Sequence, residues 1–295
     1  QVVNYYPENN RDRMLFVEGG TVASTKDNSR IGRGNMSVET AKACFYSLKS
    51  AECVTAYNGA DMAFSLPNKP MFKAFHVKEV DDNFWQMFSF RFLQGKAFSK
   101  ADFDSGLRQV VITESVAHRF FGMDDAIGKE LLLNRVTYRV CGVVKDVSKA
   151  ASTAYADAWV PYSSIPEIMG ISPNMENIRG MLNVVILAHR SHDFQTIREE
   201  IEKNRILYNS TKQDHEVSFL HNPITQWDKA RGSGGQYYVS LKDYWLETGS
   251  LLLFLLLVPA LNLLGVTQSS VQKRQAEIGV RKAFGATNRT IISQV

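Results

Sequence analysis

The stretch LLLFLLLVPALNLL (residues 251–264) lies at the centre of a longer segment, Thr248–Gln272, that contains no charged residue. A helix needs about 20 apolar residues to cross the hydrocarbon core of a bilayer, which is roughly 30 Å thick. The segment is long enough, so the sequence predicts a transmembrane helix here. Pro259 and Asn262 interrupt the run and are costly in lipid, so we expect this helix to pack against other membrane helices.

A basic segment follows the apolar run directly. It contains one acid, Glu277, and five cations: Lys273, Arg274, Arg281, Lys282 and Arg289. Lysine and arginine flank membrane helices on the cytoplasmic side. The sequence therefore predicts that the chain leaves the membrane into the cytoplasm, and that the residues before Thr248 lie outside the membrane on the opposite side.

The composition limits the class of protein further. The chain has 295 residues and a net charge of +4, and the basic segment alone carries about that excess. No basic field remains on the other residues, so we exclude nucleic acid as a partner. The chain begins at Gln1 without a signal sequence, although an external domain must be exported. We therefore expect an export signal or a first membrane helix upstream of it.

The external residues have the periodicity of a mixed α and β domain. Residues 12–18 predict a strand, residues 19–35 are rich in glycine and asparagine and predict a loop, and Ser37 predicts a helix start. A strand over residues 53–57 follows. The same succession of strand, helix and strand returns over residues 182–220.

The middle of the chain predicts shorter elements. Ser99–Asp102 has the form of a capping box, and Thr113 is expected to cap a short helix that ends at Gly122. Residues 131–144 predict a hairpin. Further along, Arg231–Gly235 is rich in glycine and predicts a flexible joint before the membrane helix.

Together these patterns predict an α+β fold, in which a split α/β subdomain is interrupted by an inserted β-rich subdomain and followed by one transmembrane helix. We expect these boundaries: residues 1–70 and 176–243 for the split subdomain, 71–175 for the inserted subdomain, 244–271 for the transmembrane helix, and 272–295 for a cytoplasmic coupling segment with the start of the next membrane segment.

The sequence contains no recognisable catalytic or metal-ligating arrangement. GMDDAIGK (residues 122–129) resembles a phosphate-binding loop, but five residues rather than four separate its glycines, and Glu130 replaces the required hydroxyl residue. His189 and His192 have no third ligand at a metal-binding spacing. We therefore predict no enzyme activity, no metal and no cofactor.

Two groups of residues leave alternatives open. Aromatic residues are dense between Phe84 and Phe92, where core packing is the first interpretation and a ligand-facing surface the second. Cys44 and Cys53 are close enough in sequence for a disulfide, but three cysteines at irregular spacing are not typical of a disulfide framework. We favour three small buried side chains.

EIGVRKAFGA (residues 277–286) resembles the segment that follows the second membrane helix of FtsX-type and MacB-type ABC transporter permeases. The external residues agree with this resemblance. Five stretches are similar to the MacB-like periplasmic core domain, in this order: VDDNFWQMF (80–88), FLQG (92–95) with Phe98, VITESVAHRFFG (111–122), AIGK (126–129) and YRVCGVVKD (138–146).

The resemblance implies a permease with four membrane helices and an ATPase on a separate or fused chain. In that family the segment after the second helix meets the ATPase, which assigns the contact here to Glu277, Arg281 and Lys282. The alternative is that these charges only anchor the helix end at the lipid headgroups. Ile278 and Phe284 favour the ATPase contact, because a simple anchor needs no apolar side.

The resemblance also implies a location and partners. The large domain is expected in the periplasm, on a permease of the inner (plasma) membrane. The implied partners are an ABC-type ATPase subunit, a second permease that completes a dimer, and a periplasmic adaptor or cargo. The external domain would transmit an ATP-driven conformational change to that cargo or partner, for export of a peptide, a drug or a lipoprotein-like substrate.

Two other functions remain open on the sequence. A permease of the same type can sense a signal or control a wall hydrolase instead of exporting a substrate. A membrane-anchored binding module that uses no ATP is the alternative from another class. A membrane-tethered hydrolase is a third idea, for which the sequence offers no residues.

Overall fold

The computed structural model of the protein describes residues 4–27, 29–67, 69–122, 125–170, 174–234, 238–273, 279–280 and 282–285. The chain forms two compact units, Gln1–Tyr238 and Val239–Val295. The first unit is the external α+β domain, and the second contains the long apolar helix.

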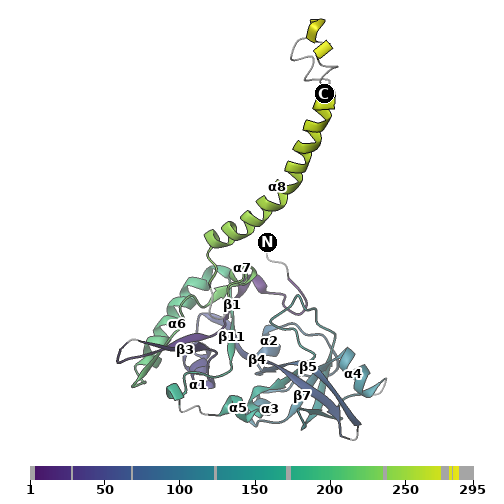
Figure 1. Ribbon diagram of the computed structural model, residues 1–295. Coiled ribbons are helices and arrows are strands. Elements are labelled where there is room, and N and C mark those ends of the chain that lie inside the picture. The colour runs from purple at the N-terminus through teal and green to yellow at the C-terminus, as the bar shows by residue number, and fades with distance from the viewer. Residues whose placement is uncertain are drawn as a thin grey trace. The chain divides into compact units, whose positions relative to one another are not determined.

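The external domain is built on one large sheet (Figure 1). Within the described residues, ten strands join it in the order β13–β1–β11–β4–β5–β10–β7–β9–β6, with β8 paired to β4 and β9. Their bounds are β1 (Met14–Val17), β4 (Ala51–Leu66), β5 (Lys69–Val80), β6 (Phe92–Gly95), β7 (Gln109–Thr113), β8 (Glu130–Leu133), β9 (Val136–Val144), β10 (Ala158–Pro161), β11 (Asn183–Ala188) and β13 (Ile224–Thr225).

Six of these strands close into a barrel. β4 pairs with β5, β5 with β10, β10 with β7, β7 with β9, and β9 with β8. β8 then returns to β4, where Leu133 lies opposite Phe64. All six strands contribute side chains to one core, which includes Phe64, Phe75 and Leu131. Closure satisfies the strand edges internally, so the β-rich part of the domain needs no covering layer there.

A second sheet occupies the residues expected to form a loop. Within the described residues it has three antiparallel strands, in the order β12 (His215–Ser218), β2 (Gly20–Ser24) and β3 (Arg30–Gly34). The loop prediction for residues 19–35 was wrong: β2 and β3 form a hairpin there, and β12 from far along the chain completes their sheet. The glycines make room for a neighbour instead: a Cβ atom at Gly34 would lie 2.7 Å from the guanidinium of Arg179.

Three helices begin at the residues that were predicted to cap them. Ser37 accepts a hydrogen bond from the amide of Thr40, Ser99 and Asp102 form the capping box, and the helix that Thr113 caps ends at Gly122 with φ +71°. The helix bounds are α1 (Val38–Ala41) continued by the π-helical η2 (Lys42–Tyr46), α2 (Phe84–Met87), α3 (Lys100–Asp104), α4 (Glu114–Phe121), α5 (Pro166–Met169), α6 (Phe194–Asn209), α7 (Gln226–Ala230), α8 (Leu241–Lys273), and the single turns η1 (Arg11–Arg13), η3 (Tyr162–Ser164), η4 (Asn174–Asn177) and η5 (Ser191–Asp193).

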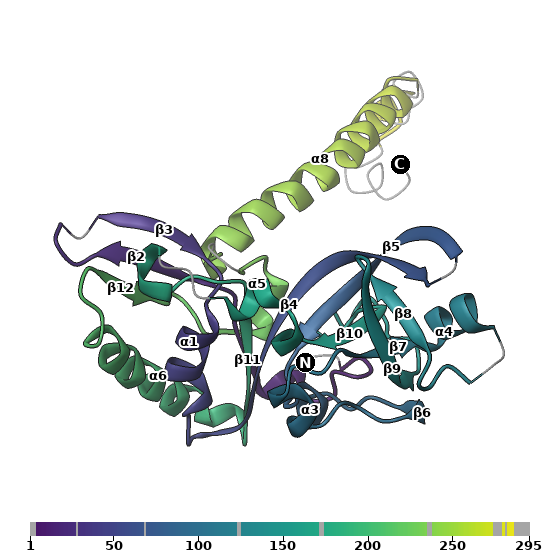
Figure 2. The ribbon, with the colours of Figure 1, turned by 90° about the horizontal axis from the view of Figure 1, so that it is seen from below.

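Both faces of the open part of the sheet are buried. Alternate residues of a strand point to opposite faces, so Leu15 and Val17 of β1 pack into the core shared with η2 and α6. Met14 and Phe16 pack on the other face against α2. Figure 2 shows α1, α6 and the three-stranded sheet on one side of the domain, and β7, β8, β9 and α4 on the other.

The predicted fold class is confirmed: an α+β domain with a β-rich middle precedes one apolar helix. The boundaries proposed at residues 70–71 and 175–176 stay a prediction. Core packing is confirmed for the aromatic residues Phe84 and Phe88, which are at most 1% exposed. Trp85 packs edge-on against Phe84 and Phe98.

The three cysteines are free; Cys44 is buried, and Cys53 and Cys141 are half-buried. Cys44 lies in the core that contains α6, whereas Cys53 packs against the core on the opposite sheet face. Burial raises the pKa of each thiol, including that of Cys141, to about 12. The thiols are therefore neutral and unreactive near neutral pH.

The second unit consists mainly of α8. Residues 241–270 form a helix that is long and apolar enough to cross a membrane, with a mean hydropathy of 2.2, among the residues that the structure describes. Ser240 caps its start by accepting a hydrogen bond from the amide of Asp243. Pro259 lies inside the helix and has no amide hydrogen to donate to the preceding turn.

Candidate functional site

The predicted ATPase contact lies largely outside the described residues. Glu277 and Arg281 are both outside them, as is Ile278. Lys282 is described and exposed, and Phe284 two residues later is 88% exposed. The assignment of this segment to an ATPase contact therefore stays a prediction.

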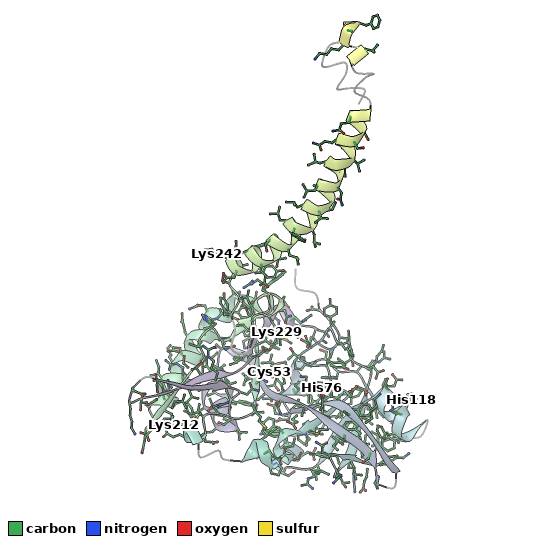
Figure 3. The ribbon with its side chains drawn as sticks, viewed as in Figure 1. Cys53, His76, His118, Lys212, Lys229 and Lys242 are labelled. Carbon is green, nitrogen blue, oxygen red and sulfur yellow. The ribbon has the colours of Figure 1, made fainter. Side chains whose placement is uncertain are left out.

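A cluster of buried and half-buried charges lies in the external domain close to its last described helix, α7. We name Glu8, Arg11, Glu18, Lys78 and Lys229 the junction cluster. They come from the residues before β1, the residue directly after β1, the last part of β5, and α7. Figure 3 shows Lys229 well away from Lys212 and His118, which lie towards opposite ends of the same domain.

Glu8 is the most deeply buried member of the junction cluster, with no exposed surface. Its Oε1 accepts hydrogen bonds of 2.8 Å from the amides of Thr153 and Ala154, and its Oε2 lies 3.0 Å from Nε of Arg11. Burial raises the pKa of Glu8 above its usual value, although these amides and the guanidinium act against that rise. A charge in such a place is stable only while its partners stay in position.

Lys229 connects α7 to two other segments. Its Nζ lies 2.7 Å from Oε1 of Glu18 and donates a 3.3 Å hydrogen bond to Oγ1 of Thr153. The same ammonium lies 4.4 Å from the ring centre of Phe16 in β1. Because Thr153 also donates its amide to Glu8, a chain of contacts runs from α7 to the residues before β1.

Lys78 completes the cluster from β5. It is 5% exposed, and its ammonium lies 4.5 Å from the ring centre of Tyr57. Burial, together with the nearby ammonium of Lys229, lowers the pKa of Lys78 to about 8, while Glu8 and Glu18 act in the opposite direction. Lys78 therefore remains mostly protonated at neutral pH, and the cluster mixes three cations with two carboxyl groups.

Residues close to Lys229 in the sequence hold α7, and with it Lys229, in position. Thr225 caps the helix and forms a capping box with Asp228. Asp228 also pairs with Arg231 at 2.5 Å, and its carbonyl accepts the amide of Ser233. Ser233 is 3% exposed, so the start of the expected flexible joint is held by contacts, whereas Gly235 lies outside the described residues.

The arrangement is suited to holding segments together. Within the described residues, no group of three His, Cys, Asp or Glu side chains is placed to bind a metal ion. His189 and His192 are exposed, and each lies near a carboxylate, Glu52 at 4.0 Å and Asp193 at 3.2 Å respectively. The junction cluster was not predicted from the sequence, because Lys78 alternates with Phe75 and Val77 of the barrel core and so takes a position of β5 where a polar residue is expected.

These observations define the class: a membrane protein with a large external domain, whose chain continues from that domain into an apolar helix. Residues 2–204 match the family model of the MacB-like periplasmic core domain, and residues 249–295 match that of the FtsX-like permease C-terminal region. The chain belongs to the MacB-like periplasmic core domain family. It is an ABC transporter permease of the MacB/FtsX type.

Curated relatives support this membership. The ABC transporter permease YknZ of Bacillus subtilis (strain 168) is 23% identical over 218 residues, which is 74% of this chain and 51% of YknZ. The pyoverdine export ATP-binding/permease protein PvdT of Pseudomonas fluorescens (strain ATCC BAA-477) is 26% identical over 257 residues, 85% of this chain and 36% of PvdT. The chain thus spans about half or less of the length of these relatives.

Solved structures are similar in part. The periplasmic region of MacB from Actinobacillus actinomycetemcomitans aligns with a TM-score of 0.48 at 18% identity, covering 72% of this chain and 92% of that one. The extracellular domain of YknZ from Gram-positive bacteria aligns with a TM-score of 0.47 at 16% identity, covering 62% of this chain and 88% of that one.

Proposed function

We propose that the chain is the external domain, membrane helix and coupling segment of an ABC permease that an ATPase partner drives. ATP binding and hydrolysis on that partner close the membrane helices, and the motion passes along residues 249–266 and the joint at residues 232–235 into the external domain. This domain then acts on a periplasmic cargo or protein partner. The chain itself supplies no ATP hydrolysis.

The junction cluster is the observation that carries this proposal. Lys229 belongs to the segment that leaves the external domain, and Glu8 belongs to the segment that enters it. Thr153 contacts both, at 3.3 Å from Nζ of Lys229 and 2.8 Å from Oε1 of Glu8. A displacement of the leaving segment therefore reaches the entering segment through short polar contacts, and the domain moves as one body.

The family supports the location and the partners that we propose. They are the inner (plasma) membrane with the domain in the periplasm, an ATPase subunit, a second permease and a periplasmic adaptor or cargo. The relative PvdT is described as an ATP-binding/permease protein for export, which supports an export role here. Control of a wall hydrolase and an anchored module without ATP are the alternatives.

The first experiment tests the ATPase contact. The full-length permease is purified from membranes with its ATPase, as wild type and with Glu277→Ala and Arg281→Ala combined. We expect the double variant to insert normally and to lose the ATPase. The control is Lys203→Ala, an exposed residue of α6 in the external domain. If the wild type captures no ATPase, the ATP-driven function is wrong and the anchored module replaces it.

The second experiment tests transmission through the junction cluster. A spin label is placed at Leu207→Cys, which is 69% exposed on α6, while the native thiols stay neutral. Distances between labels in the permease pair are measured with and without nucleotide. We expect Lys229→Met to keep ATPase activity and to reduce the nucleotide-dependent change in distance. An unchanged distance response in this variant would contradict the role of the cluster.

A further inference from the structure

The turn η4 has an unusual backbone conformation. Met175, Glu176 and Asn177 have φ angles of 59°, 50° and 60°, so three successive residues other than glycine lie in the left-handed region. For L-amino acids this region is unfavourable because the Cβ atom approaches the following carbonyl oxygen, and it is normally visited by single residues. Contacts from outside the turn must therefore hold it in place.

The side chain of Glu176 supplies the strongest of these contacts. Its Oε1 accepts the amide of Gln213 at 2.9 Å, and its Oε2 accepts the amides of Asp214 and His215 at 3.1 and 2.9 Å. Nδ1 of His215 also lies 3.1 Å from Oε2. Three successive backbone amides, in the turn between α6 and β12, thus converge on one carboxylate.

Two ion pairs flank this site, so its other charges balance. Nζ of Lys212 donates to the carbonyl oxygen of Glu176 at 2.9 Å and pairs with Glu39 at 2.6 Å. The carboxylate of Asp214 is paired with Lys26 at 2.8 Å, so its negative charge is partly offset. Although burial opposes the charged form, the hydrogen bonds from residues 213–215 hold the pKa of Glu176 below its usual value.

We propose that the amides of residues 213–215 form a carboxylate-binding site, which Glu176 occupies as an internal ligand and which also accepts a carboxylate from outside the chain. Successive backbone N–H groups that point the same way are a general anion-binding device. The Glu176 side chain is 28% exposed, so an external group can reach the site. Its replacement would free η4 from a strained conformation.

The chemistry of the site defines the class of external ligand. Both carboxylate oxygens are bound by N–H groups, so the ligand needs two acceptor oxygens and a negative charge. A carboxylate meets this requirement from two sources: an acidic side chain of a protein that docks on the external domain, or a small free carboxylic acid. The site is independent of the junction cluster, so this inference does not depend on ATP-driven transport.

The test uses the full chain in detergent with Glu176→Gly. Glycine tolerates the left-handed conformation, so this variant empties the site without adding strain. Hydrogen exchange is measured by mass spectrometry on the peptide that covers residues 213–215. We expect exchange about tenfold faster than in the wild type, because amides lose bonds to a charged acceptor. Glu202→Gln is the matched control, since the carboxylate of Glu202 binds the side chain of Arg205 and no backbone amide.

Two probes then identify the source of the ligand. Sodium acetate and a blocked hexaglutamate peptide are added to the Glu176→Gly variant at equal carboxylate concentration, with sodium chloride at matched ionic strength as the reference. Protection by the peptide above that by acetate assigns the site to an acidic protein segment, and equal protection assigns it to a small carboxylate. If neither probe protects residues 213–215 more than chloride does, Glu176 serves only to link η4 to residues 213–215, and the inference is wrong.

Discussion

The carboxyl group of Asp81 is buried, and no cation among the described residues contacts it. The change in the free energy of unfolding as this group ionises can therefore be predicted quantitatively. The residue lies at the end of β5 and is 1% exposed. Its Oδ1 accepts the Thr55 hydroxyl at 2.5 Å and the Phe84 amide at 3.0 Å, while its Oδ2 accepts the Tyr46 hydroxyl and the Ala56 amide. Burial raises the pKa of Asp81 to about 6, although these hydrogen bonds act against the rise.

The sign of the pH effect on stability follows from the pKa of Asp81 in the folded and the unfolded chain. The carboxyl group has a pKa of about 6 in the folded chain and 3.8 when unperturbed, so the folded state binds the proton more tightly. Its contribution to stability is complete below pH 3.8 and is lost as the pH rises through 6. At about 1.4 kcal/mol for each pH unit between these values, the loss is about 3 kcal/mol.

The assay compares the wild type with Asp81→Asn in urea unfolding of the full chain at pH values from 4 to 7. Asparagine cannot ionise, so we expect the stability difference, wild type minus variant, to fall by about 2.4 kcal/mol over this range, because part of the loss has already occurred at pH 4. Asp102→Asn is the control: hydrogen bonds from Ser99 lower the pKa of this half-buried carboxyl, which moves its titration away from the range in which Asp81 titrates. A difference for Asp81→Asn that is flat or rising with pH would refute the reasoning.

Three further predictions concern packing and the contacts of α6 and α7. Phe84→Ala, which truncates a side chain with no exposed surface, should lower the free energy of unfolding by about 3 to 5 kcal/mol in chemical denaturation. Lys229→Met should cost about 1 to 2 kcal/mol because the ion pair between Lys229 and Glu18 is lost, and Lys229→Arg should recover part of it. Asn209→Ala removes two hydrogen bonds to the backbone of Val217, so we expect a loss of about 2 kcal/mol and faster amide exchange in β12.

Local signals in the sequence were sufficient for the helix boundaries. The hydroxyl caps at Ser37, Ser99 and Thr113 and the glycine stop at Gly122 act within one turn of the helix that they begin or end. Their chemistry is therefore visible in a short stretch of sequence. The apolar helix α8 was predictable for the same reason, because length and composition decide it.

Long-range pairing was not predictable in the same way. β2 and β3 have few apolar residues, and β12 completes their sheet from the far end of the external domain. The closure of the barrel depends on the contact of β8 with β4, which neither strand reveals by itself. The candidate site has the same property, since Glu8, Lys78 and Lys229 meet only when three distant segments fold together.

The length of β4 limits how the external domain can be divided by proteolysis or in a chimaera. Its 16 residues span roughly 50 Å; the first part pairs with β11 in the open sheet and the last part with β8 in the barrel. The change from one architecture to the other therefore occurs inside a hydrogen-bonded strand, where a protease has no loop to cut. Limited digestion should release the external domain as a single fragment, and a chimaera that exchanges its β-rich part must be joined in the middle of a strand.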